Sequence, residues 1–244
     1  MDALDVVLLV VGGLFAGCVN TIAGGGSLLT VPLLVLVGVP GDVANGTNRL
    51  GILTSNVSAA EEFRRQGVAG LSRVVPVLVP VVIGALVGSV LISRVDAGSF
   101  ERVFGVLMVP LLLLSLRPPQ IHSATHLWSA RTAAVLFFVV GLYAGAFQAG
   151  IGLLMMPALA RAGLDVVVAN NVKVLVVVAV TCTALPVFIA GGLVDWGPGL
   201  ILAAGFLVGG ALGARMTVVG GDRVVRPVLT VAVLAMAGHL LGLY

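Results

Sequence analysis

The stretch that decides the fold of this chain reads AGCVNTIAGGGSLLTVP, residues 16–32. An apolar run reaches Ala23, three glycines interrupt it at positions 24–26, and a short second run, 26–38, contains Pro32. Glycine permits backbone conformations that other residues avoid, and proline cannot donate a hydrogen bond inside a helix. The stretch therefore predicts two helices that meet at a turn, in place of one continuous helix.

The composition of the chain excludes an ordinary soluble protein. Of its 244 residues, 59% are hydrophobic and only 9% are charged, and the mean hydropathy is +1.20. Soluble globular proteins carry about 25% charged residues to cover their surface. Most of the outside of this protein must therefore face lipid.

The charges are scattered singly between apolar runs, and the formal net charge is only +3. Because no basic patch with interleaved aromatic residues is present, we expect no nucleic-acid partner. Cys18 and Cys182 are far apart in apolar stretches, which fits neither a disulfide framework nor a metal or redox pair. We expect no metal and no cofactor. The N-terminus has no basic segment before its apolar run, so we expect a retained first span and no cleaved signal peptide.

The apolar runs predict an all-α, polytopic membrane protein with eight full spans and two short segments. The runs lie at about 4–23, 26–38, 46–60, 74–93, 103–116, 132–149, 150–160, 174–190, 197–214 and 227–243. A spanning helix needs about 20 residues, and the runs 26–38 and 150–160 are shorter. Each follows a glycine-rich break and contains a proline, Pro32 or Pro157. Irregular backbone at membrane depth is tolerated only where protein buries it or where it lines a cavity, so these two segments are predicted to be broken or re-entrant helices.

A shift of 125 residues aligns the two halves of the chain. The informative identities include Gly25 with Gly150, Pro32 with Pro157, and the Ala-Asn pair 44–45 with 169–170. With a gap of three residues, Asn20 falls opposite Gln148. We therefore expect a first transmembrane repeat at 1–116, a polar cytoplasmic linker at 117–130 and a second repeat at 131–244.

The distribution of arginine indicates that the two repeats are inverted. If both glycine-rich breaks reverse the chain, nine arginines lie on one face and only Arg94 and Arg102 on the other. If each broken segment is one pass, the count is five against six and gives no orientation. Cytoplasmic loops carry the excess of basic residues. The sequence thus predicts inverted-topology repeats with both termini on the outer face.

Polar residues that a membrane would otherwise exclude recur after each broken segment. We take them as candidate substrate-binding residues: Asn45, Asn48, Arg49, Asn170, Asn171 and Lys173. Each group opens a long apolar helix, so free N–H groups at the positive end of that helix are expected beside the amides and the cation. Such a combination binds anions. The alternative is that the asparagines cap helices at the membrane interface while the two cations reach out to lipid headgroups.

Residues of the breaks themselves complete the candidate site. Asn20 and Gln148 could donate amide hydrogen bonds, or could instead hold unwound backbone. Backbone would approach an anion closely at the glycines Gly24, Gly25, Gly26 and Gly150. In contrast, the glycines of Gly84-x3-Gly88 and of Gly205-x3-Gly209-x3-Gly213 predict tight helix packing.

The sequence offers no convincing catalytic or metal centre. His122 and His126 lie in the polar linker without a third ligand. The turn Gly24–Ser27 has no base and orienting acid, since His239 is the only histidine in an apolar run. We therefore do not expect an enzyme.

Residues 16–32, together with Ala44-Asn45-Gly46-Thr47-Asn48-Arg49, resemble the TauE/SafE sulfite exporter family, and the likeness extends over nearly the whole chain. The resemblance implies a prokaryotic inner-membrane permease for a small sulfur-containing anion, such as sulfite, a sulfonate or sulfoacetate. Our main hypothesis is an exporter that works by alternating access around a midplane anion site. The alternative is a non-transporting assembly or scaffold subunit whose polar residues hold helices together. The oligomeric state, including a homo-oligomer, stays open.

Overall fold

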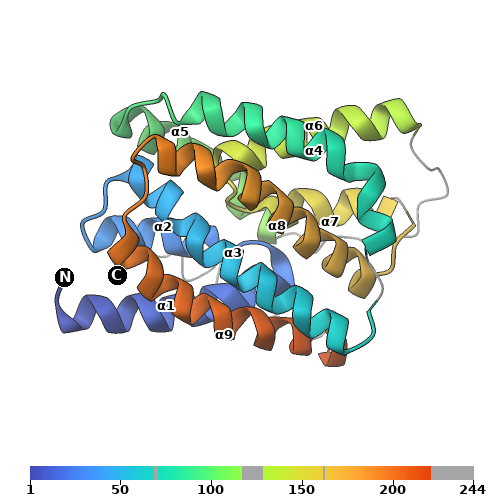
Figure 1. The fold of residues 1–244 in the computed structure, drawn as a ribbon, viewed down its shortest axis with the longest axis horizontal. Helices are drawn as coiled ribbons and strands as arrows, with labels where there is room; N and C mark the ends of the chain where they lie inside the picture. Colours follow the sequence, from blue (N-terminus) through green and yellow to red (C-terminus); the bar gives the residue numbers. More distant parts are fainter. Residues whose placement is uncertain (69–70, 117–128, 162, 221–244) are drawn as a thin grey trace.

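A computed structural model describes residues 1–68, 71–116, 129–161 and 163–220 of the chain (Figure 1). These residues form nine α-helices and no β-strand. The helices are α1 (Ala3–Ala23), α2 (Ser27–Leu36), α3 (Gly41–Arg65), α4 (Leu71–Ile92), α5 (Ala97–Leu116), α6 (Ala130–Ala146), α7 (Ile151–Arg161), α8 (Val166–Ala190) and α9 (Trp196–Gly220). The prediction of an all-α fold is confirmed. The predicted run 227–243, His239 and most of the polar linker, with His122 and His126, lie outside the described residues.

Three of the described helices, α1, α8 and α9, are long and apolar enough to cross a membrane, compared with the eight full spans expected. Shorter apolar helices are α2 and the segments Val77–Ile92 of α4 and Arg131–Ala146 of α6. Helix α3 has 25 residues, about 37 Å of helix, but its many polar residues keep its mean hydropathy low. Large apolar side chains are exposed along the outer helices, for example Val79 on α4 (65% exposed) and Leu200 on α9 (60% exposed). This surface is typical of a polytopic helical membrane protein.

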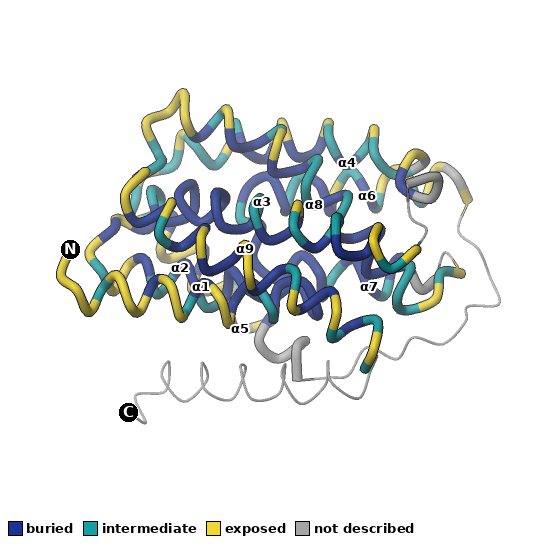
Figure 2. Tube along the Cα trace, turned by 60° about the horizontal axis from the view of Figure 1, so that its bottom comes forward, coloured by how far each residue is buried: buried dark blue, intermediate teal, exposed yellow. Residues whose placement is uncertain are grey.

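The helices form three layers (Figure 1). Helices α1 and α9 make one outer layer, α4 and α6 make the other, and α3 and α8 run between them with the short helices α2 and α7, while α5 packs against α3 and α7. Figure 2 shows that buried residues are concentrated along α3 and α8. The polar residues of α3 are therefore inside the protein rather than on its lipid-facing surface.

The outer layers are held by glycine contacts of the kind that the sequence predicted. A Cβ atom added to Gly209 of α9 would overlap the Leu14 carbonyl of α1, and one added to Gly88 of α4 would overlap the Leu142 carbonyl of α6. Small residues allow helix backbones to approach this closely. Each of these pairs joins a helix from residues 1–116 to one from residues 130–220. The two predicted repeats are therefore interlocked and do not form separate cores.

The chain reverses direction at both glycine-rich breaks (Figure 1). Helix α2 leads back toward the end of the bundle at which α1 begins, and α7 leads back toward the opposite end, at which α6 begins. The broken helices thus enter the bundle from opposite ends, and their turns come together in its interior.

Candidate substrate site

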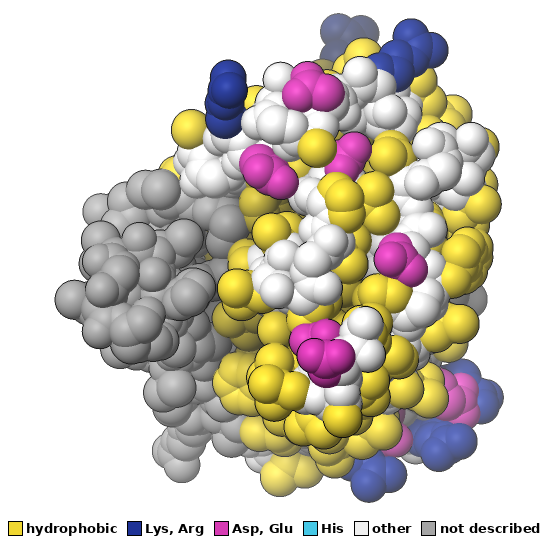
Figure 3. All heavy atoms as spheres, turned by 90° about the vertical axis from the view of Figure 1, so that its left-hand side faces the viewer, with side chains coloured by type: hydrophobic (Ala, Val, Ile, Leu, Met, Phe, Trp, Pro, Cys, Tyr) yellow, Lys and Arg dark blue, Asp and Glu magenta, His cyan; other side chains and the backbone are white. Residues whose placement is uncertain are grey.

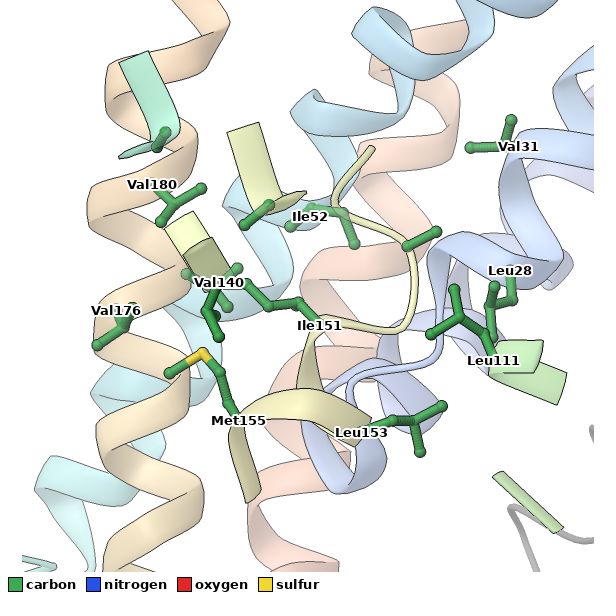
Figure 4. Close-up of a cluster of buried hydrophobic side chains, with 14 of the residues drawn as sticks. Leu28, Val31, Ile52, Leu111, Val140, Ile151, Leu153, Met155, Val176 and Val180 are labelled. Carbon is green, nitrogen blue, oxygen red and sulfur yellow. The ribbon is translucent and has the colours of Figure 1, made fainter. Parts of the chain in front are cut away.

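The two breaks touch each other through backbone. Gly24, which ends α1, has a positive φ of 76°, and a Cβ atom added there would overlap Cα of Gly152 at the start of α7. In the second break, Gly150 has a φ of 68°. Apolar side chains enclose this break, because Ile151 and Met155 of α7 extend toward α8 (Figure 4). Glycine is needed at position 24 because both its backbone conformation and the available space exclude larger residues.

The cation of the first half binds the broken helix of the second half. Arg49 on α3 donates hydrogen bonds to the last carbonyls of α6: Ala144 (3.4 Å), Gly145 (2.5 Å) and Ala146 (3.2 Å). The amide of Asn45 also donates to the Ala146 carbonyl (2.8 Å). The last carbonyls of a helix have no partner within it and form its negative end. Arg49 and Asn45 therefore stabilise the interrupted end of α6.

The second half repeats this arrangement on the first. Lys173 on α8 donates to the carbonyls of Asn20 (3.1 Å) and Thr21 (2.6 Å) near the end of α1. The Asn170 amide donates to the Ile22 carbonyl (3.4 Å) and to the Thr217 hydroxyl (3.2 Å). Each half of the chain thus supplies a cation and an asparagine to the broken helix of the other.

The burial of these residues overturns the alternative in which they reach the membrane interface. Arg49 and Asn45 are 0% and 1% exposed, and Lys173 and Asn170 are each 1% exposed. The asparagines are not helix caps either, because α3 starts at Gly41 and α8 at Val166.

One detail of the predicted site is wrong. Free N–H groups at the start of α3 and α8 were expected beside the cations, but the two helices begin about a turn earlier than the asparagines. In α8, Asp165 accepts hydrogen bonds from the Val167 and Val168 N–H groups (3.1 and 3.0 Å). The cations instead contact the negative ends of α1 and α6. The helix N-termini that lie at the breaks are those of α2 and α7.

The structure brings Asn48 to the first break but not Asn171 to the second. The Asn48 amide donates to the Ser27 hydroxyl (2.9 Å) and accepts from the Thr30 hydroxyl (2.5 Å), which fixes α2 against α3. Asn171 donates to the Val68 carbonyl (3.0 Å) beyond the end of α3. In the described part of the second half, Asn171 therefore makes no contact that corresponds to those of Asn48.

The remaining break residues hold irregular backbone. The Asn20 carbonyl accepts hydrogen bonds from the Gly24 N–H (2.6 Å) as well as from Lys173. A Cβ atom at Gly26 would clash with Ala16, whereas one at Gly25 would find ordinary contacts. Gly26 is thus required for packing, while Gly25 leaves room near the turn.

Gln148 has a φ of 60°, the one positive value at a non-glycine position in the described part of the chain. Its amide donates to the Thr181 hydroxyl (2.5 Å). Left-handed backbone is unfavourable for such a residue, and strain of this kind clusters at functional sites. The second break thus contains a strained residue that is held by a hydrogen bond to α8.

Sequence reasoning missed four side chains that complete the site. Thr181 and Thr217 accept from Gln148 and Asn170, the Tyr143 hydroxyl donates to the Ala149 carbonyl, and the Phe188 ring lies 4.3 Å from the Arg49 guanidinium carbon. Thr181 could have been found, since it lies on the same helical face as Asn170 and Lys173, at a spacing of three to four residues per turn. The other three have no comparable signal in the sequence.

Comparison with known proteins shows the family of the chain. The model of the family described as "Sulfite exporter TauE/SafE" matches residues 9–240. The chain belongs to the TauE/SafE family. A "Probable membrane transporter protein" of Haemophilus influenzae is 28% identical, over 98% of this chain and 95% of its own length. A "Probable membrane transporter protein YfcA" of Escherichia coli K12 is 27% identical, over 93% of this chain and 86% of its own length. YunE of Bacillus subtilis is 26% identical, over 87% and 89%. No solved structure matches the chain.

Membership of the TauE/SafE family identifies the chain as a membrane transporter. A transporter of this kind has a small substrate and functions in a lipid bilayer.

Proposed function

We propose that this TauE/SafE protein transports a small sulfur-containing anion, such as sulfite, a sulfonate or sulfoacetate, through the site where its two broken helices meet. The observation that carries the proposal is a pair of buried cations, Arg49 and Lys173, one from each half of the chain. Among the described residues, the only buried acid is Glu62, and it pairs with Arg215 (2.7 Å) near the end of α3. The interior around the breaks therefore holds two positive charges and no negative one.

A bound anion would compensate the positive charge of this interior. A charge at the centre of a bilayer costs about 2.5–3.5 kcal/mol on insertion scales. The carbonyls at the ends of α1 and α6 supply only partial negative charge. The N-termini of α2 and α7 add positive potential at the same place, because both helices begin at the breaks. An oxyanion between the two turns is favoured by both features.

Access to the site requires movement. Asn20 is 4% exposed, Gln148 is 2% exposed, and the cations are buried, so the site is closed to both ends of the bundle in this structure. We infer that α1–α2 and α6–α7, which enter from opposite ends, open in turn and give alternating access. Discontinuous helices of inverted repeats build midplane substrate sites in other secondary transporters.

The proposed orientation of the protein in the membrane rests on the charged residues at the two ends of the bundle. Figure 3 views the end of the bundle at which α1 begins, and acidic side chains are spread over it. Acidic residues of the helix starts and loops at this end are Asp2, Asp5, Asp42, Asp96, Glu101 and Asp195. The opposite end carries Arg64, Arg65, Arg131 and Arg215. The positive-inside rule makes that second end cytoplasmic and the start of α1 external.

Export is the favoured direction. A membrane potential that is negative inside drives a monovalent anion outward with about 2.3 kcal/mol per 100 mV. The only buried acid among the described residues, Glu62, lies away from the breaks, so nothing near the site suggests a carboxylate proton relay. The proposed transporter is an anion exporter driven by the potential.

Vesicles reconstituted with the purified protein and loaded with labelled sulfite test this proposal. A potential that is negative inside should accelerate efflux from wild-type vesicles. Arg49→Gln and Lys173→Met should abolish that acceleration, whereas Arg102→Gln, at an exposed position of α5, should not. Efflux that ignores the potential and requires a proton or sodium gradient would overturn the uncoupled mechanism.

The amount of folded protein and its anion binding, measured for two asparagine variants, address the alternative of a non-transporting subunit. If Asn45 and Asn170 only hold helices together, replacing them by leucine should lower the amount of folded protein. Normal amounts of folded protein that no longer bind anions would favour a substrate site.

A further inference from the structure

Three amide oxygens at the breaks have no hydrogen-bond partner among the described residues. They are Asn45 Oδ1, Gln148 Oε1 and Asn170 Oδ1, and their residues are only 1%, 2% and 1% exposed. A buried acceptor without a partner is destabilising by about 1–3 kcal/mol. Asn45 and Gln148 lie at the end of α6, and Asn170 lies at the end of α1. Free acceptors at both interrupted helix ends indicate a function other than stability.

The hydrogen bonds that these amides do make prove that the free atoms are oxygens and not NH2 groups. Asn45 and Asn170 contact the carbonyls of Ala146 and Ile22, and a carbonyl can only accept. Amide orientations are assigned from such partners, and here the partners leave one choice.

The same reasoning identifies the unpartnered atom of the Gln148 amide as its oxygen. Its amide contacts the Thr181 hydroxyl, whose own hydrogen is donated to the Val177 carbonyl (2.7 Å). The hydroxyl must therefore accept from the amide nitrogen, and the oxygen of Gln148 is left free. The unused side-chain capacity of these three amides is acceptor capacity.

Two of these acceptors lie beside positive charge. Asn45 and Arg49 share the Ala146 carbonyl, and Asn170 binds the carbonyl next to the one that Lys173 holds. A bare metal cation would satisfy the amide oxygens but would be repelled by two buried cations. An anion without hydrogen-bond donors would satisfy the cations but would face the lone pairs of the amide oxygens.

We propose that the substrate is an anion that carries its own hydrogen-bond donor: a protonated oxyanion such as hydrogen sulfite, or a sulfonate with a hydroxyl group. The negative oxygens lie toward Arg49, and the O–H group donates its one hydrogen to the free oxygen of Gln148, next to Asn45 at the end of α6. This inference rests on the proposed function, since it specifies the substrate of the same site. It also gives a reason for the strained backbone of Gln148, which holds one of the three acceptors in place.

Two sulfonates of equal charge and similar size provide the direct test: 2-hydroxyethanesulfonate and ethanesulfonate. Calorimetric titration of the purified full-length protein in detergent should give roughly tenfold tighter binding of the hydroxylated compound, the ratio that corresponds to about 1.4 kcal/mol. Sulfite binding should weaken as the pH rises and hydrogen sulfite loses its proton. This second measurement needs no variant of the protein.

Two variants test whether Gln148 is responsible for the preference for the hydroxylated sulfonate. Gln148→Met removes an acceptor whose amide group holds no carbonyl of the break, and it should reduce the preference for the hydroxylated sulfonate to within about twofold. Asn56→Leu is the control. Asn56 also has a free buried oxygen, but it donates to Ile52 in its own helix and lies seven residues beyond Arg49, about 10 Å along α3. It should keep the preference.

The outcomes separate the two levels of the proposal. If the wild-type protein binds both sulfonates equally and binds sulfite without pH dependence, the acceptors are filled by water and this inference is wrong, while the anion site stands. If neither sulfonate nor sulfite binds, the proposed function itself fails. A loss of the preference in Asn56→Leu as large as that in Gln148→Met would also overturn the assignment to the breaks.

Discussion

Replacing Gly24 by alanine should destabilise the protein more than the same replacement at other glycines with left-handed backbone. Gly24 has a φ of 76°, and the left-handed conformation costs alanine about 1–2 kcal/mol. The added Cβ would also overlap the backbone of Gly152, and overpacking of this kind costs about 1–3 kcal/mol. The free energy of unfolding should thus fall by about 2–5 kcal/mol.

Gly67→Ala and Gly192→Ala are the matched controls. Their φ values are 72° and 69°, and an added Cβ would meet nothing within 4 Å at either position. Each should lose only the conformational part, about 1–2 kcal/mol. The entropy that alanine removes from the unfolded chain is similar at all three sites, so it cancels in the comparison.

Unfolding of the purified protein in mixed micelles, with increasing sodium dodecyl sulfate and helicity followed by circular dichroism, measures the difference. Gly24→Ala should unfold at a clearly lower fraction of dodecyl sulfate than either control, and should also lose sulfite efflux. Equal midpoints for the three variants would refute the close contact between the two breaks.

Three further predictions follow from other contacts. Gly209→Leu should separate α9 from α1 and sharply reduce the yield of folded protein, measured by size-exclusion chromatography, whereas Gly105→Leu on α5, where an added Cβ meets nothing, should leave the yield unchanged. Asp165→Ala should lower the free energy of unfolding by about 1 kcal/mol through loss of the α8 cap, and Asp165→Asn, which can still accept those hydrogen bonds, should restore most of it; equal losses would contradict the capping role. Arg49→Lys should lower stability by about 1–3 kcal/mol in the same unfolding assay, because one ammonium group cannot hold the three carbonyls that the planar guanidinium reaches; unchanged stability would show that the fork geometry is unimportant.

The sequence determined the class of fold and the position of the breaks. A composition with 9% charged residues and long apolar runs requires a lipid-facing helical protein. Glycine clusters followed by Pro32 and Pro157 marked the two interruptions, because these residue types restrict helix continuity locally. The spacing of Gly84 and Gly88, and of Gly205 and Gly209, similarly predicted close helix packing.

Only the tertiary structure decided what the polar residues do. The sequence placed Asn45 and Arg49 next to their own break, yet their partners are carbonyls about 95–101 residues away in α6. Asn171 has the same residue type as Asn170, but one step around a helix turns it toward Val68 instead. Local pattern determines which residues share a helical face, whereas the interlocking of the two halves determines which carbonyl each donor meets, and that depends on contacts between helices distant in sequence.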